Sequence, residues 1–141
     1  MSTFWVRHAP DSVSLVRRSI VDYLDRAGVT GEESFTAALI ASELVSNAVR
    51  HAPPLPTGNL AIGWQLSDGS YTISVTDGGR AATITPRDSG PDAASGRGLA
   101  IVAAIAESWG VEGDGEHTTV WARRSFTQPV RWRGPVLSCC S

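Results

Sequence analysis

A short glycine-containing motif in the C-terminal half of the chain has the residue types that bind a phosphate group. Gly96-Arg97-Gly98-Leu99 directly precedes an apolar segment that is typical of a helix. Glycines let a phosphate approach the backbone, the free N–H groups and the dipole of a helix N-terminus favour an anion, and Arg97 adds a fixed positive charge. Because glycines often precede helices, this motif alone is weak support for an anion site.

Three further positions carry polar residues that need an explanation. Glu43 and Asn47 are four residues apart in the segment ASELVSNAVRHA, so in a helix they project from one face and, if buried, need partners. A capping or inter-helix hydrogen bond could supply these partners. Asp77-Gly78-Gly79 follows an apolar strand pattern and could be an ordinary turn, and Thr118-Thr119 has the usual composition of a strand.

The elements around these motifs predict an α+β domain. We predict a strand over residues 3–8, a helix capped by Asp11 or Ser12 and ended by Gly28, and a helix over 31–52 with a capping box of Thr30 and Glu33. Residues 59–66 and 71–76 predict a β-hairpin, residues 98–107 a third helix, and residues 109–112 with 118–122 a closing hairpin. The order predicts a two-layer sandwich in which three helices cover one face of a mixed, mostly antiparallel sheet.

Two segments lack a regular pattern. The stretch from Gly78 to Arg97 is rich in glycine, proline and alanine and has only Ile84 as a large apolar residue, which predicts a long loop of the kind used as lids. After Arg124 the pattern decays, so we expect a domain over residues 1–124 and a tail of unknown role over 125–141. The tail holds the chain's two cysteines side by side, which excludes a disulfide framework and favours a reducing, cytoplasmic location.

The composition excludes several other classes of protein. The 141 residues, 42% of them apolar, suffice for one domain with its own core. All 12 basic residues are arginine, so the lysine-dependent chemistry of P-loop enzymes, classical protein kinases and Schiff bases is absent. The net charge of −2 provides no electrostatic footprint for nucleic acid or an anionic membrane. We find no apolar run of the roughly 20 residues that span a bilayer and no signal-peptide pattern.

The order and spacing of the motifs resemble the GHKL ATPase superfamily, which contains ATP-binding domains of gyrase, heat-shock chaperones, histidine kinases and MutL. ELVSNA is similar to its N box, and the motifs beginning at Asp77, Gly96 and Thr118 are similar to its three glycine boxes. The resemblance covers residues 1 to about 124 and is strongest to the anti-sigma-factor serine kinases and related short ATP-binding proteins of actinobacteria. It implies a Bergerat-type fold with a flexible ATP lid over residues 78–95.

The resemblance implies a role for each matching residue. Asp77 would accept a hydrogen bond from the adenine amino group, and Gly79 would let the base lie against the backbone. Asn47 would coordinate Mg²⁺, which bridges phosphate oxygens of ATP. Glu43 would be the general base toward the attacking hydroxyl.

The last two boxes supply the remaining predicted contacts. Gly96, Gly98 and Leu99 belong to the box beneath the phosphates, where Arg97 fits the same anionic site. Thr119 is the nearest match to the threonine of the final box. In that box the family usually has glycine before threonine, whereas this chain has His117-Thr118.

The function implied by the resemblance is an ATP- and Mg²⁺-dependent serine/threonine protein kinase of the anti-sigma type. It would bind a sigma factor or phosphorylate a STAS-type antagonist and so regulate transcription, as a homodimer formed through the first strand and helix, without direct contact to nucleic acid or membrane. One alternative is a nucleotide-gated protein-binding module without phosphotransfer. Another, the catalytic half of a histidine kinase, would need a dimerising hairpin with a phospho-acceptor histidine from a second chain.

Overall fold

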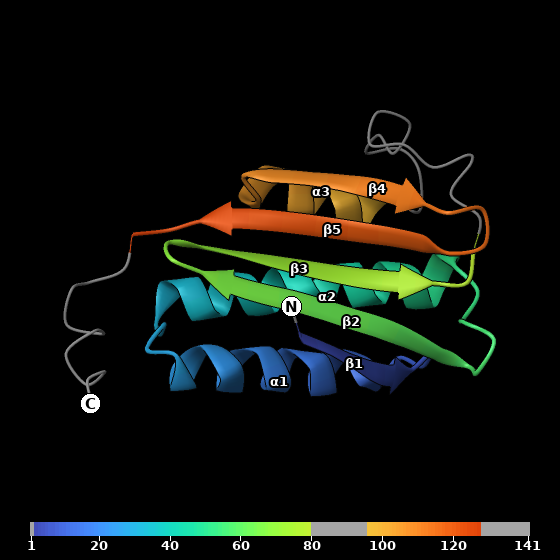
Figure 1. Ribbon diagram of the computed structural model, residues 1–141, viewed down its shortest axis with the longest axis horizontal. Helices are drawn as coiled ribbons and strands as arrows, with labels where there is room; N and C mark the ends of the chain where they lie inside the picture. The colour runs from blue at the N-terminus through green and yellow to red at the C-terminus, as the bar shows by residue number, and fades with distance from the viewer. Residues whose placement is uncertain (1, 80–95, 128–141) are drawn as a thin grey trace.

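The computed structural model of the protein is a two-layer α+β sandwich (Figure 1). It describes residues 2–79 and 96–127. Within these ranges the elements, in chain order, are β1 (Ser2–Arg7), α1 (Ser12–Arg26), α2 (Glu32–His51), β2 (Asn59–Ser67), β3 (Ser70–Asp77), α3 (Gly96–Ile105), β4 (Ser108–Gly113) and β5 (Thr118–Ser125). The predicted α+β class and the predicted order of elements are confirmed.

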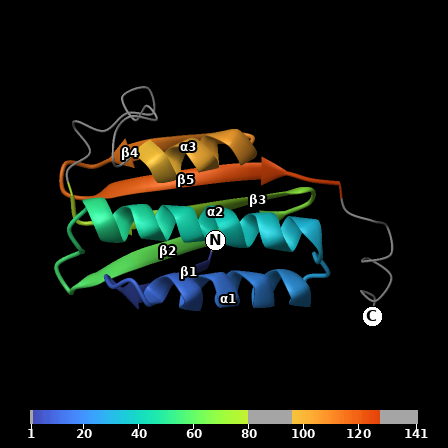
Figure 2. The same ribbon diagram turned by 180° about the vertical axis from the view of Figure 1, so that it is seen from behind.

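The strands form one sheet in the order β1-β2-β3-β5-β4. Each pair of neighbouring strands is antiparallel. The described part of the sheet is therefore fully antiparallel, whereas the predicted sheet is mixed and mostly antiparallel. All three helices lie on one face of the sheet (Figure 2), as predicted. The β3–β5 pairing joins the strand that precedes the lid segment to the strand that closes the domain.

The core lies between the helices and the sheet. Alternate residues of β3 point into it, because Tyr71, Ile73 and Val75 are buried while the residues between them are half-exposed. Helix α2 is buried on more than one side, since Ala37, Ala38, Ile40 and Ala41 are all buried. Helix α1 rests on the sheet through the Tyr23 ring, whose centroid lies 3.9 Å from that of Trp64 on β2.

The starts of the first two helices differ from the prediction. The residue before α2 is Gly31, with φ +72°, and no side-chain hydrogen bond caps the helix, so the capping box of Thr30 and Glu33 is wrong. Glycine adopts this left-handed conformation without a Cβ clash and turns the chain into the helix. Asp11 precedes α1 but its side chain does not cap it, and the Ser12 hydroxyl instead donates to the Arg7 carbonyl at 2.7 Å.

A single arginine binds Glu33, which does not cap its own helix, and also contacts the end of α3. Arg124 on β5 donates from Nε to Glu33 Oε1 at 3.0 Å and from Nη1 to the carbonyl of Ile105, the last residue of α3, at 2.6 Å. Helix α3 covers Gly96–Ile105, two residues earlier at each end than predicted. The contacts connect the start of α2, the end of α3 and β5.

Parts of two predicted segments lie outside the described residues. These parts are residues 80–95 of the expected lid and residues 128–141 of the expected tail. Of the described helices, none combines the length and the apolar character that a bilayer crossing requires.

Candidate functional site

One end of the sandwich brings together segments that are far apart in the sequence. Figures 1 and 2 show the C-terminal end of α2, the end of β3, the start of β5 and the first turn of α3 at this same end. Residues from all four predicted motifs lie on these segments. The fold therefore gathers the four motifs in space.

Asp77 is the last residue of β3 and its side chain is buried, at 4% exposure. Its Oδ1 accepts a hydrogen bond from the backbone N–H of Gly79 at 2.7 Å. This contact closes the turn at the strand end and leaves Oδ2 as the acceptor for an N–H group of a ligand. Burial raises the pKa of the Asp77 carboxyl, and this effect outweighs the Gly79 hydrogen bond and the nearby His8 and His117, which lower it.

The turn after Asp77 is packed against the proline-rich segment that follows α2. The N–H of Gly78 donates to the Pro53 carbonyl at 3.0 Å. A Cβ at Gly78 would lie 2.1 Å from the carbonyl oxygen of Pro54, so no larger residue fits this position without a backbone shift. His8 contacts the residue just before this segment, because its Nε2 lies 2.6 Å from the Ala52 carbonyl oxygen. The turn after Asp77 is therefore held against a segment that has its own contact to His8.

Asn47 lies on α2 and is buried at 9% exposure. Its side-chain Oδ1 is buried and has no hydrogen-bond partner among the residues that the structure describes. A buried amide oxygen without a partner is costly. In this chain the oxygen lies at the end of the sandwich that also holds Asp77. It could coordinate a cation there or accept a hydrogen bond from a ligand.

Glu43 precedes Asn47 by one helical turn and therefore shares its face of α2. Its side chain is half-buried and makes no hydrogen bond or ion pair with another described residue. Its carboxylate is thus available as a proton acceptor.

The two threonines of the closing strand point to opposite faces of the sheet. Thr118 pairs with Asp77 across the β3–β5 ladder, is 1% exposed, and donates from its hydroxyl to the Gly79 carbonyl at 2.7 Å. Thr119 pairs with Thr76, and the two hydroxyl oxygens are 2.7 Å apart on the face without helices. The structure therefore brings Thr118 to Asp77 and Gly79, whereas the predicted Thr119 lies away from them. Alternation along β5 is the local signal for Thr118, because it shares the buried face of the strand with Val120 and Ala122.

The first turn of α3 provides the predicted phosphate end of the site. Gly96, Arg97 and Gly98 begin this helix, so their backbone N–H groups have no partner within the helix itself. The side chain of Arg97 is not among those described. Leu99 is 1% exposed and belongs to the hydrophobic core, so its side chain anchors the helix, and a ligand could meet only its backbone.

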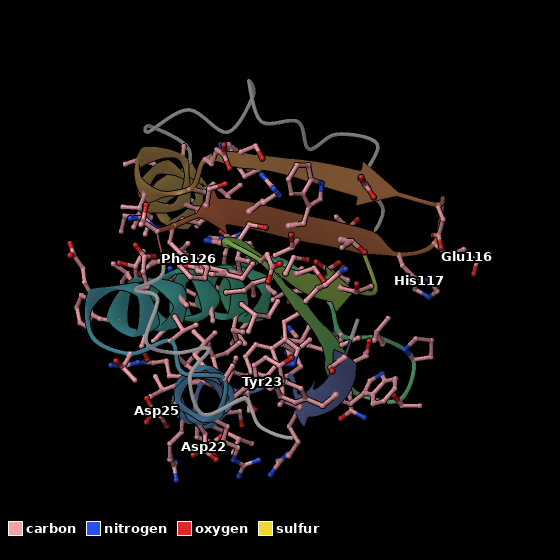
Figure 3. The ribbon with its side chains drawn as sticks, turned by 60° about the vertical axis from the view of Figure 1, so that its left-hand side comes forward. Asp22, Tyr23, Asp25, Glu116, His117 and Phe126 are labelled. Carbon is pink, nitrogen blue, oxygen red and sulfur yellow. The ribbon has the colours of Figure 1, made fainter. Side chains whose placement is uncertain are left out.

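His117 lies at the turn between β4 and β5, beside the start of the strand that carries Thr118 (Figure 3). The turn is closed by Asp114, whose Oδ1 accepts from the N–H groups of Glu116 and His117 at 2.9 and 2.7 Å. These hydrogen bonds lower the pKa of Asp114 to about 2. The turn therefore fixes the start of β5.

Comparison with known families identifies the class of this domain. Residues 6–124 match the family model for a histidine kinase-like ATPase domain, and the chain belongs to this family. Membership indicates ATP binding and, at the general level, ATP-dependent kinase-like activity. A comparison with curated proteins gives no match.

Proposed function

We propose that the protein is an ATP- and Mg²⁺-dependent protein kinase of the anti-sigma type that phosphorylates a serine or threonine of a protein partner. The observation that carries the nucleotide site is the buried Oδ1 of Asn47, which has no hydrogen-bond partner within residues 2–79 and 96–127 and lies at the same end of the sandwich as the buried carboxylate of Asp77. Family membership supports ATP as the ligand. The candidate residues offer polar groups for its adenine base, its metal ion and its phosphates.

The adenine base would meet Asp77. Oδ2 of this carboxylate has no hydrogen-bond partner among the described residues and would accept from the exocyclic amino group of adenine. Gly79, held by Asp77 and Thr118, would let the ring lie beside the backbone. Guanine has a carbonyl oxygen at the equivalent position. Because two acceptors would then face each other, the site selects adenine.

Asn47 fits the expected magnesium ion. Its amide oxygen is a hard ligand, and Mg²⁺ in nucleotide sites takes one or two protein oxygens and completes its shell with phosphates and water. The bound ion would neutralise the phosphate charge. Since the chain has no lysine, the first turn of α3 and Arg97 supply the remaining positive potential.

Glu43 would accept the proton in phosphotransfer. A serine or threonine oxygen of the partner forms a bond to the γ-phosphorus, the bond from that phosphorus to the β,γ-bridging oxygen breaks, and ADP leaves. The hydroxyl proton moves to the Glu43 carboxylate, which is free of other described partners. The resemblance to anti-sigma-factor kinases supports a sigma factor or a STAS-domain antagonist as the partner, in the cytoplasm.

Incubation with ATP labelled at the γ-phosphate and a STAS-type antagonist tests the proposal. We expect label on the antagonist with the wild type, and loss of label but retained ATP binding with Glu43→Gln. Glu32→Gln, at the exposed first turn of the same helix, is the matched control and should transfer label normally. ATP-dependent capture of the antagonist without transfer, unchanged in Glu43→Gln, would instead establish a nucleotide-gated binding module.

A further inference from the structure

His8 contacts both ends of the loop over residues 52–58, which connects α2 to β2. At the start of the loop, Nε2 of His8 lies 2.6 Å from the carbonyl oxygen of Ala52. At its end, the carbonyl oxygen of Gly58 accepts from the backbone N–H of His8 at 3.1 Å. Because a carbonyl oxygen can only accept, Nε2 must carry the hydrogen of the first contact. The residue that follows β1 therefore joins the two ends of this loop.

The loop is rich in proline, which limits how it can be held in place. Three prolines lie within it, and proline has no backbone N–H to donate. At these positions only the carbonyl groups can make backbone hydrogen bonds. Two consecutive carbonyls are used as anchors, because Ala52 accepts from His8 and Pro53 accepts from the N–H of Gly78 at 3.0 Å. The contact to His8 is thus next in the chain to the contact that holds Gly78.

The loop supports the turn that the adenine base would contact. Figures 1 and 2 show the end of β1, the loop after α2 and the end of β3 at the same end of the sandwich. A Cβ at Gly78 would lie 2.1 Å from the carbonyl oxygen of Pro54. A Cβ at Gly79 would lie 3.1 Å from the ring of Pro53. With packing this close, a displacement of the loop must displace the turn as well.

We propose that His8 is a positioning residue of the nucleotide site: it holds the loop over residues 52–58 in place, and the loop fixes the turn from Asp77 to Gly79 where the adenine base binds. This inference rests on the proposed function, because it takes that turn as the adenine contact. His8 lies outside the four motifs that carry the family resemblance. It sets the affinity for the base by keeping the turn in its binding geometry before the ligand arrives.

Positioning differs from a second way in which His8 could act, through its charge. A protonated His8 is near enough to Asp77 to lower the pKa of that carboxyl, as is His117. However, no hydrogen bond joins either histidine to Asp77 among the described residues. The hydrogen bond to Ala52 needs only a donor at Nε2, whether the ring is charged or neutral. A neutral donor of the same reach should therefore be sufficient.

Titration calorimetry of the full chain with ATP and with tripolyphosphate, each with Mg²⁺, tests this role. We expect His8→Ala to bind ATP about fivefold more weakly than the wild type, because the turn loses part of its support. The same variant should bind tripolyphosphate as the wild type does, because that ligand has no base. His8→Gln should bind ATP like the wild type, since its amide nitrogen is as many bonds from the backbone as Nε2 of histidine and carries no charge.

Ser12→Ala is the matched control. The hydroxyl of Ser12 donates to the Arg7 carbonyl at 2.7 Å, so this variant also loses one hydrogen bond from a side chain to a carbonyl, but to one outside the loop. It should lower the free energy of unfolding and leave ATP affinity unchanged. If His8→Ala fails to fold by circular dichroism, His8→Asn takes its place, because the shorter amide cannot reach the Ala52 carbonyl.

The outcomes separate the role of His8 from the proposed function. Unchanged ATP affinity in His8→Ala, equal losses for ATP and tripolyphosphate, or an equal loss of ATP affinity in Ser12→Ala would overturn the positioning role and leave the proposed function intact. A loss that His8→Gln shares would overturn it in favour of the charge of the ring. A wild type that does not bind ATP would instead contradict the proposed function, and the role of His8 with it.

Discussion

The hydroxyl of Thr118 donates a hydrogen bond to the carbonyl oxygen of Gly79 at 2.7 Å, from the first residue of β5 to the turn that follows β3. Gly79 also donates its N–H to Asp77. The two contacts hold both polar groups of the Gly79 backbone, directly before residue 80, where the described part of this segment ends. Thr118 therefore positions the turn that the adenine base would contact.

Substitution of this threonine should weaken both folding and nucleotide binding. Thr118→Val keeps the shape of the side chain but leaves the Gly79 carbonyl without its donor, so we expect a loss of about 1 kcal/mol in the free energy of unfolding. ATP affinity should fall several-fold, because the turn is no longer held. Urea denaturation and titration calorimetry measure the two effects.

Thr119→Val is the matched control for this experiment. It removes the hydrogen bond to Thr76 on the face without helices, so it should lower stability by a similar amount and leave ATP affinity unchanged. If Thr119→Val weakens ATP binding and Thr118→Val does not, the assignment of Thr118 to the site is wrong.

Asp77 should oppose folding in the absence of ligand. Burial raises its pKa in the folded protein above the unfolded value, so ionisation of the carboxyl favours the unfolded chain. Neutral Asp77 should therefore increase the free energy of unfolding at low pH, and this contribution should be lost as pH rises through the raised pKa. Asp77→Asn, which still accepts from Gly79, should be at least as stable as the wild type at pH 7. This advantage should shrink toward pH 4.

Urea denaturation of the two proteins at several pH values measures this difference. Asp114→Asn is a useful control, since its pKa is lowered to about 2 and the sign is opposite. In the wild type, the ionised Asp114 carboxyl should stabilise the fold above the unfolded pKa of about 3.9, and this stabilisation should be lost as pH falls toward 2. A wild type whose advantage over Asp77→Asn grows with pH would contradict the proposed cost of burying Asp77.

Substitution of Asn47 should abolish the Mg²⁺ dependence of ATP binding and leave the free energy of unfolding nearly unchanged. Asn47→Ala removes a buried oxygen that has no described partner, so the gain from removing it and the loss of packing should nearly cancel, to within about 1 kcal/mol. ATP affinity measured with Mg²⁺ and with a chelator should differ in the wild type and be equal in the variant. Ser42→Ala, on the same helix, should keep the difference. Retained Mg²⁺ dependence in Asn47→Ala would place the ion elsewhere.

Arg124 should be the most important ion-pair residue for stability. Its removal leaves Glu33 and the Ile105 carbonyl without donors in a partly buried region. We expect Arg124→Gln to cost about 1–3 kcal/mol of unfolding free energy. Arg26→Gln breaks the exposed pair with Asp22 and should cost less than about 0.5 kcal/mol. Equal thermal shifts for the two variants would contradict this difference.

Periodicity and motif spacing predict the order of the elements and most of their ranges. They fail where a contact between residues far apart in the sequence determines which partner a side chain binds. Glu33 has the spacing of a capping box with Thr30, but Arg124, 91 positions away, binds it instead. Likewise, the family pattern points to Thr119, whereas the register between β3 and β5 places Thr118 beside Asp77. Strand pairing and side-chain partners of this kind depend on tertiary structure, which a local pattern does not contain.

The most direct test of the proposed site is titration calorimetry of ATP and GTP, each with Mg²⁺, against the wild type and Asp77→Asn. The wild type should bind ATP at least about tenfold more tightly than GTP, and Asp77→Asn should lose about 1–3 kcal/mol of ATP binding free energy, because one buried charged acceptor is replaced. Equal affinity for the two nucleotides in the wild type, together with unchanged ATP affinity in Asp77→Asn, would contradict the proposed nucleotide site.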